Sequence, residues 1–108
     1  MSEAFLIIGY QPTSGPLRGA LANLKLARFD GTRLVYVGSV GTGFSDAAGT
    51  MLRTKLDAIV TPKCAVGGLK VKGAVWVAPE LQAEIAYRGL TTAGELRHAS
   101  FKGLQQDP

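Results

Sequence analysis

The segment Gly41-Thr42-Gly43-Phe44-Ser45-Asp46 lies between an apolar run and a stretch of helical periodicity. Exposed backbone amides at such a strand-to-helix turn can bind a phosphate, including one of a DNA backbone. No Gly-Lys-Ser/Thr follows, so the segment is not a Walker loop, and the third glycine of a dinucleotide fingerprint is missing. A tight turn without a ligand is the simpler interpretation, because glycine is so common in turns.

A second candidate is Lys55-Leu56-Asp57-Ala58, which resembles the Lys-x-Asp-Gly element with which nucleotidyltransferases take up AMP. The glycine is absent, and Lys55 falls mid-helix on a solvated face beside the core position Leu56. A nucleophilic lysine needs burial or a cationic neighbour to lower its pKa. We therefore interpret the match as coincidental.

The remaining reactive residue types form no catalytic group in the sequence. Cys64 is the only cysteine and His98 the only histidine. A lone cysteine is usually a small packed side chain, and His98 lacks a nucleophile or metal ligands to act with, so we interpret both as structural. Glu80 and Glu84 flank a strand start, where nothing positions a substrate between them. The sequence predicts no catalytic residue and no metal site.

The chain is basic: twelve Lys and Arg residues face eight Asp and Glu, a formal net charge of +4. This excess favours a polyanionic partner such as nucleic acid. The candidate DNA contacts lie on the first hairpin and its lead-in, at the glycine turn, and in or beside the loop 62–73: Arg18, Lys25, Arg28, Arg33, Thr42, Lys63, Lys70 and Lys72. A solvated rim explains the same cations equally well. The nucleic-acid interpretation requires them to lie together, without acidic groups between them.

Three strands are predicted before the glycine turn, at 5–10, 19–29 and 33–40, and they form a meander. In the second strand, alternation places Ala20, Ala22, Leu24 and Leu26 on the buried face, and Asn23 and Lys25 on the other. Asp30-Gly31 is a strong hairpin signal, because glycine tolerates the positive φ of a tight turn. Gly38, inside the third strand, indicates a bulge that helps a sheet to curl.

After the turn, Ser45 is a typical N-cap, and residues 46–58 form one amphipathic helix. Strands are predicted at 74–77 and 81–88, with a short sixth one at 96–101. This order predicts an all-β class: a β-barrel with one helix, namely a five-stranded OB-fold with the helix 46–58 between strands 3 and 4. The fold commonly binds nucleic acid. Residues 1–108 are expected to form a single domain.

The sequence contains neither a leader-like N-terminus nor an apolar run near 18 residues. A single cysteine also excludes an intramolecular disulfide. We therefore expect a cytoplasmic protein that does not bind membranes.

Four segments, in order along nearly the whole chain, resemble the C-terminal domain of bacterial ligase D-type ATP-dependent DNA ligases. They are Phe5–Tyr10 (FLIIGY), Tyr36–Phe44 (YVGSVGTGF), Trp76–Leu81 (WVAPEL) and Gly94–Leu104 (GELRHASFKGL). The Val-Gly-Thr-Gly-Phe and Leu-Arg-His-x-Ser-Phe-x-Gly-Leu runs are the specific ones.

The resemblance implies an OB-fold that follows a nucleotidyltransferase domain carrying an adenylated lysine. With ATP and Mg²⁺ or Mn²⁺, the joined protein would seal a 5′-phosphate to a 3′-hydroxyl at nicks in duplex DNA, in the repair of double-strand breaks. None of the nucleotidyltransferase motifs is present here. The chain alone is therefore expected not to ligate DNA.

The sequence departs from the family pattern in two places. The family usually continues past Gly-Leu with Arg-x-Asp-Lys, which orients the pyrophosphate of ATP, whereas here Gln105-Gln106-Asp107-Pro108 keeps only Asp107. Gln105 and Pro108 offer no full charge to a triphosphate. Ser39, also a candidate DNA contact, stands where the family often has Lys.

An alternative function is a free-standing, catalytically inactive OB module that recruits or completes a separate ligase.

Overall fold

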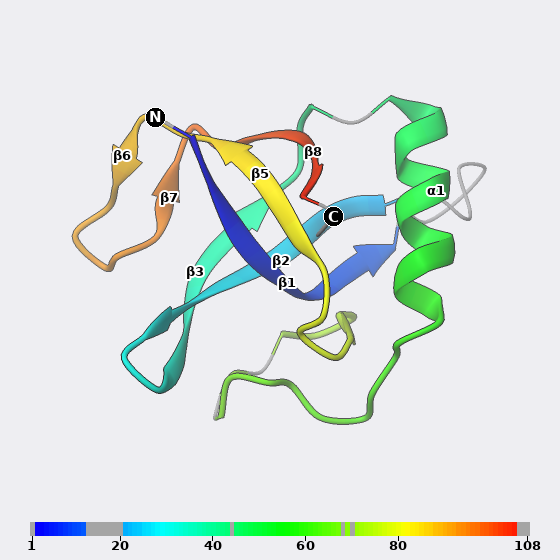
Figure 1. Cartoon of the computed structure of the whole chain (residues 1–108), viewed down its shortest axis with the longest axis horizontal. Helices are drawn as coiled ribbons and strands as arrows, with labels where there is room; N and C mark the ends of the chain where they lie inside the picture. Colours follow the sequence, from blue (N-terminus) through cyan, green and yellow to red (C-terminus); the bar gives the residue numbers. More distant parts are fainter. Residues whose placement is uncertain (1, 13–20, 44, 68, 70, 106–108) are drawn as a thin grey trace.

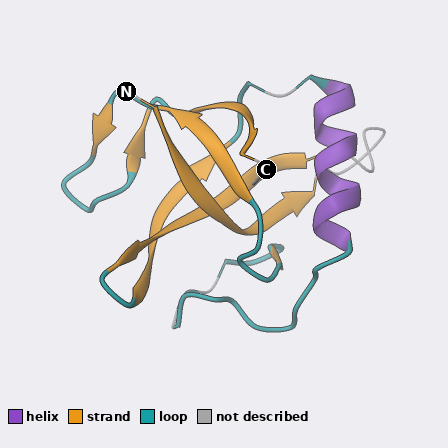
Figure 2. Cartoon of the chain, viewed as in Figure 1, coloured by secondary structure: helices purple, strands orange, loops and turns teal. Residues whose placement is uncertain are grey.

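The computed structural model describes residues 2–12, 21–43, 45–67, 69 and 71–105. Figures 1 and 2 show a curled sheet with a helix at one side and a small hairpin at the other. The elements are β1 (Ser2–Pro12), β2 (Leu21–Asp30), β3 (Arg33–Val40), α1 (Asp46–Asp57), β4 (Val75–Trp76), β5 (Gln82–Ala86), β6 (Gly89–Leu90), β7 (Leu96–Arg97) and β8 (Ser100–Gln105). The helix found in these ranges has 12 residues, well below the length that spans a bilayer.

Strand β1 is the centre of the main sheet, whose strands follow the order β3-β2-β1-β5-β8. On one side β1 pairs with β2. On the other side its first half pairs with β5 and its second half with the short β4. The register shifts between Ile7 and Gly9, and such a bulge adds twist to a strand. The sheet therefore curls over itself, with β3 and β8 as its two edges and no closed barrel (Figure 1).

The predicted class and element order are confirmed. The first hairpin turns at Asp30-Gly31, where Gly31 has a φ of 69°. Gly38 has a φ of 109° and lies at the predicted bulge. The helix is capped by Ser45, whose side chain accepts a hydrogen bond from the Ala48 amide, and it ends one residue before the predicted 58.

The last strands are arranged differently from the prediction. The expected strand 74–77 is reduced to β4, and the expected strand 81–88 ends at Ala86 before β6 begins. The expected sixth strand, 96–101, divides between β7 and β8. The positive φ of His98, 55°, interrupts the extended chain at this division.

The predicted faces of β2 are correct at Leu24 and Leu26, which are fully buried, and wrong at the start of the strand; the predicted Ala20 lies outside the described residues. Ala22 is exposed and Leu21 is buried in its place. The cause is a second register shift, at the end of β1, where Pro12 pairs with Leu21 and Ala22 is skipped. A bulge reverses which side chain faces the core, and simple alternation cannot show it.

The core fills the space between the curled sheet and α1. Leu52 and Leu56 of the helix are fully buried, and they lie in one cluster with Tyr10, Leu24 and Val40. Burial of such side chains from both layers is the main source of stability for a chain without disulfides.

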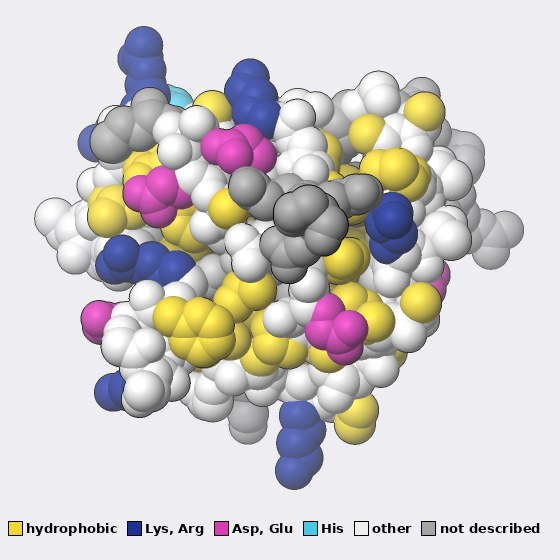
Figure 3. Space-filling view, viewed as in Figure 1, with side chains coloured by type: hydrophobic (Ala, Val, Ile, Leu, Met, Phe, Trp, Pro, Cys, Tyr) yellow, Lys and Arg dark blue, Asp and Glu magenta, His cyan; other side chains and the backbone are white. Residues whose placement is uncertain are grey.

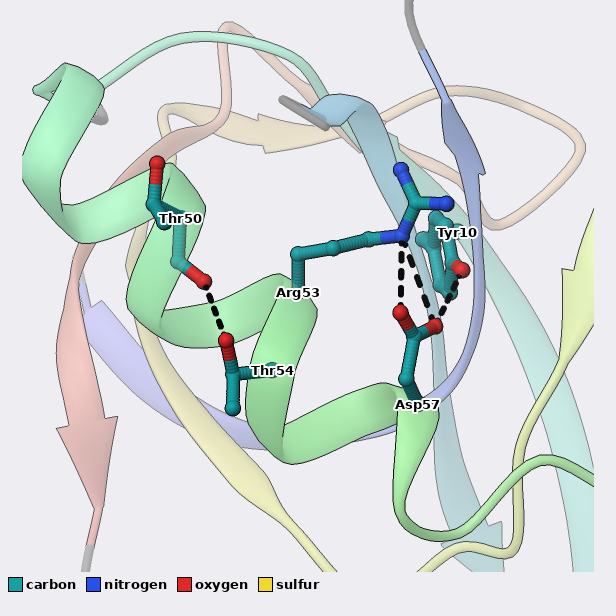
Figure 4. Close-up of polar contacts among 5 residues, drawn as sticks. All are labelled: Tyr10, Thr50, Arg53, Thr54 and Asp57. Atoms are coloured by element: carbon teal, nitrogen blue, oxygen red, sulfur yellow. Dashed lines mark hydrogen bonds and ion pairs between the residues drawn. The ribbon is translucent and has the colours of Figure 1, made fainter. Parts of the chain in front are cut away.

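A polar contact fastens the helix to β1 at the edge of this core. The hydroxyl of Tyr10 donates to Asp57 Oδ1 at 2.5 Å, and Arg53 Nε lies 3.2 Å from Asp57 Oδ2 (Figure 4). The guanidinium of Arg53 also lies over the Tyr10 ring, 4.9 Å from its centre. Burial, followed by the hydrogen bond to Asp57, raises the pKa of Tyr10. The phenol therefore remains a donor through the neutral pH range. On the same helix, Thr54 donates to the Thr50 carbonyl (Figure 4).

The core role of α1 can be tested with Leu56→Ala, which removes a fully buried side chain. We expect the free energy of unfolding to fall by about 2–5 kcal/mol, because the space left behind cannot collapse completely. Met51→Ala is the matched control on the same helix: its side chain is 45% exposed, and its loss should cost about 0.5 kcal/mol or less. Urea denaturation measures both, and equal losses would contradict the assignment of faces.

Candidate nucleic-acid interface

The glycine turn after β3 is joined to the beginning of β8. The Thr42 carbonyl accepts a hydrogen bond from the Phe101 amide at 2.9 Å, and the Thr42 hydroxyl donates to the Ala99 carbonyl at 3.1 Å. Gly43 has a φ of 94°, and a Cβ at this position would lie 2.4 Å from the Phe101 oxygen. The glycine is needed for this close approach of two backbones. The simpler interpretation of the segment, a tight turn, therefore accounts for it without a bound phosphate.

This contact brings together the two most specific runs of the sequence, 57 residues apart at Thr42 and Ala99. Thr42 itself is exposed, but the proton of its hydroxyl is already donated within the chain. Its hydroxyl proton is therefore not free to bind a DNA phosphate, which leaves only the backbone of the turn for such a contact.

The predicted contacts on the first hairpin differ in accessibility. Arg28 and Arg33 are exposed near its turn, and Ser39 is exposed on β3. Arg18 lies outside the described residues. Lys25 is the exception, with only 5% of its surface exposed.

The burial of Lys25 corrects the prediction that it lies on an open face. In the antiparallel register, Lys25 is opposite both Gly9 and Ser39, and Gly9 is also opposite Trp76. Directly opposed residues project from the same side of a sheet. The Trp76 ring occupies the room above Gly9, where a Cβ would lie 2.6 Å from it, and so fills the space beside Lys25. Burial lowers the pKa of Lys25.

The loop 62–73 carries the second group of predicted cations. Lys63 and Lys72 are exposed, whereas Lys70 lies outside the described residues. The loop is held at its end by Gln11, which donates to the Lys72 carbonyl at 3.1 Å and accepts from Asn23 at 2.9 Å. These two side chains link the loop to β1 and β2.

The exposed cations do not form a continuous track on the face shown in Figure 3. Lys and Arg side chains stand apart there, with Asp and Glu between them. The sequence-based expectation that they lie together is therefore not met on this face. The ion pair found in the described ranges is Arg53–Asp57, so Arg28, Arg33 and the two loop lysines stay unpaired there.

One group of cations missed by the sequence reasoning surrounds a pocket of about 280 Å³ at the β6–β7 hairpin. It is lined by Arg88, Gly89, Leu90, Arg97 and His98. The signal was present in the sequence, because Arg97-His98 lies inside one of the two family-specific runs. A smaller pocket of about 160 Å³ includes Arg28 and the exposed Phe29.

Residues 17–108 match the model of a family described as "ATP dependent DNA ligase C terminal region". The chain belongs to this family. It is 33% identical to the multifunctional non-homologous end joining protein LigD of Pseudomonas aeruginosa, over 99% of this chain and 14% of that protein. LigD of Mycolicibacterium smegmatis is 28% identical, over 98% of this chain and 14% of its own length. The chain thus spans about a seventh of these relatives.

Solved ligase structures share the fold over the whole domain. The ligase domain of M. tuberculosis LigD superposes with a TM-score of 0.88 at 27% identity, covering 97% of this chain and 35% of that one. A mycobacterial DNA ligase D complexed with ATP and MES gives a TM-score of 0.85 at 28% identity, covering 100% and 35%. The chain is thus a ligase D-type C-terminal domain with the OB-like fold expected from its sequence.

The divergent end of this ligase domain lies largely beyond the described part. Gln105 is the last residue of β8, while Asp107 and Pro108 lie outside the described residues. The departure of Gln105 and Pro108 from the basic motif that the resemblance implies therefore stays a prediction from the sequence.

The close approach at Gly43 predicts a large effect of Gly43→Ala. The added Cβ meets the Phe101 backbone, and the positive φ disfavours any side chain. We expect a loss of at least about 2 kcal/mol in the free energy of unfolding. Gly67→Ala is the control, since a Cβ there meets nothing within 4 Å, and it should change stability by about 0.5 kcal/mol or less. Similar thermal denaturation curves for the two variants would exclude a special role of this turn.

The burial of Lys25 predicts that Lys25→Met is tolerated. At pH 7 the free energy of unfolding should stay the same or rise by up to about 1 kcal/mol, because a desolvated ammonium is replaced by an apolar chain of similar length. The folded-state pKa lies below the ordinary 10.5, so the cost of burying the charge disappears as the pH rises toward 10.5. The difference between variant and wild type should shrink over that range in denaturant titrations. A loss of stability in Lys25→Met would instead reveal a partner for the ammonium.

Proposed function

We propose that this domain grips duplex DNA at a nick and completes a nucleotidyltransferase domain, so that the joined ligase seals a 5′-phosphate to a 3′-hydroxyl during end-joining repair. The observation that carries the proposal is the match to the ligase domain of M. tuberculosis LigD along 97% of the chain. The matched part is about a third of that ligase domain. In this proposal the domain supplies the substrate-holding part of the enzyme, and the nucleotidyltransferase domain supplies the adenylated lysine.

In this proposal the DNA is held through its backbone by separate cations. The face in Figure 3 has no continuous basic track, so the support for DNA binding comes from the ligase match and not from a cluster of charges. The exposed side chains proposed to contact phosphates are those of Arg28, Arg33, Ser39, Lys63 and Lys72. Thr42 would contribute only the backbone of its turn, because its hydroxyl already donates to the Ala99 carbonyl. Arg18 and Lys70 belong to the same proposed set from the sequence. Lys25 is left out because its ammonium is largely covered. Phosphate contacts fix the position of a protein on DNA without selecting a base sequence, which suits an enzyme that must act at any break.

ATP and the divalent metal, Mg²⁺ or Mn²⁺, are assigned to the joined enzyme. Within the described ranges, no group of three or more His, Cys, Asp or Glu side chains is placed to hold a metal ion. In this proposal the metal is held by the nucleotidyltransferase domain and not by the described residues of this domain. The protein would act in the cytoplasm, where bacterial DNA lies.

A salt titration of binding to a nicked duplex tests the backbone grip. Affinity should fall steeply between about 50 and about 200 mM salt, because each phosphate contact releases counterions. The double variant Lys63→Ala/Lys72→Ala should weaken binding to all DNA sequences alike and reduce the salt slope by about one or two. Lys55→Ala on α1 is the matched control and should leave the slope unchanged. Binding that ignores ionic strength would rule out a phosphate-led contact.

A further inference from the structure

A pocket lies at the β6–β7 hairpin, where Gly89 has no side chain and the other lining residues have long ones. Gly89 is opposite Arg97 in the register, and the Arg88 amide donates to the Arg97 carbonyl at 2.9 Å. A Cβ placed on Gly89 would meet nothing within 4 Å. A side chain at position 89 would therefore enter open space, on the side of the hairpin that Arg97 shares.

The lining of this pocket is strongly cationic. Arg88, Arg97 and His98 are three of the five residues that line its volume of about 280 Å³. None of the residues that line it is acidic. The nearest acid along the hairpin, Glu95, directs its carboxylate toward β3, where Oε1 lies 3.5 Å from the position of a Cβ on Gly38. Figure 3 shows a histidine beside Lys and Arg side chains at the end of the molecule that carries β6 and β7.

The pocket is held in place by the core of the domain. His98 has a φ of 55°, a left-handed conformation that a non-glycine residue adopts at a cost. The chain on its C-terminal side is tied to the glycine turn through the Ala99 carbonyl and the Phe101 amide. On the other side, the hairpin turn is closed by the Thr91 amide, which donates to the Glu95 carbonyl at 2.7 Å. The side chains of Arg88, Arg97 and His98 thus start from a fixed backbone.

We propose that Arg88, Arg97 and His98 form a binding pocket for a single phosphate group of a polynucleotide. Guanidinium groups match phosphate oxygens with paired hydrogen bonds, and an imidazole adds a further donor. The volume of about 280 Å³ is larger than one phosphate needs, so the adjoining sugar has room beside it. Leu90, 48% exposed on the wall, offers an apolar surface to the adjoining sugar. This inference rests on the proposed DNA-binding function.

The phosphate could be an internal diester of the duplex or the terminal 5′-phosphate at a nick. Three fluorescent duplexes distinguish these sources: an intact one, one nicked with a 5′-phosphate, and one nicked with a 5′-hydroxyl. If the wild-type chain binds all three alike, the pocket takes a diester. A preference for the 5′-phosphate nick identifies the terminal monoester.

The decisive variant is Gly89→Glu, which places a carboxylate in the pocket where the structure has room for a side chain. We expect it to weaken binding of the preferred duplex about tenfold, the size expected for loss of a charged hydrogen bond. Gly89→Gln is the matched neutral control and should have a clearly smaller effect. Arg97→Ala should also weaken binding about tenfold, whereas Lys55→Gln on α1 should change it less than about twofold. Circular dichroism and thermal unfolding confirm that each variant is folded.

The outcomes separate this inference from the proposed function. If the wild type binds duplex and Gly89→Glu binds equally well, the pocket proposal is wrong while DNA binding stands. If the wild type binds no duplex, the proposed function fails, and NMR titration with inorganic phosphate then decides the pocket by itself. Saturable shifts of the Arg88, Arg97 and His98 side-chain signals, absent in Gly89→Glu, would support it. No shift at these residues would overturn it.

Discussion

The two edges of the curled sheet meet at one place, where the Phe101 amide of β8 donates to the Thr42 carbonyl beyond the end of β3. No continuous ladder joins β3 and β8 within the described part, so this contact, with the Thr42 hydroxyl bond to Ala99, holds the open side together. It depends on the absence of a side chain at Gly43. The direction in which the chain leaves His98, and hence the position of the β6–β7 hairpin, follows from it.

The arrangement of charge gives the domain two different surfaces. Over the face in Figure 3, cations are dispersed among acids, which favours solubility and weak, non-specific attraction. At the hairpin, two arginines and a histidine share one pocket without an acid in its wall. A weak general attraction combined with the proposed phosphate position would suit the proposed role of finding a break and holding it in register. Net charge alone does not distinguish these two situations.

The fold was largely predictable, because its signals are local. The hairpin at Asp30-Gly31, the N-cap at Ser45 and the helical spacing of Leu52 and Leu56 depend on neighbours in the chain. The errors arose where distant strands determine the outcome. The exposure of Ala22 follows from a shift in pairing with β1, and the burial of Lys25 follows from a tryptophan 51 residues away that leans over Gly9. Neither the exposure of Ala22 nor the burial of Lys25 can be predicted from the alternation of apolar and polar residues in β2.

The sequence by itself determined the class, the order of the elements and the ligase family, because periodicity, turn residues and family-specific runs are properties of the linear chain. Only the tertiary structure decided which cations are accessible and which share a site. Arg88 and Arg97 lie on either side of a turn in the chain, and they line one pocket because β6 pairs with β7. Lys25 and Arg28 are three residues apart, yet one is covered and the other is exposed. Accessibility depends on what packs across the sheet, and that is fixed by contacts between residues far apart in the chain.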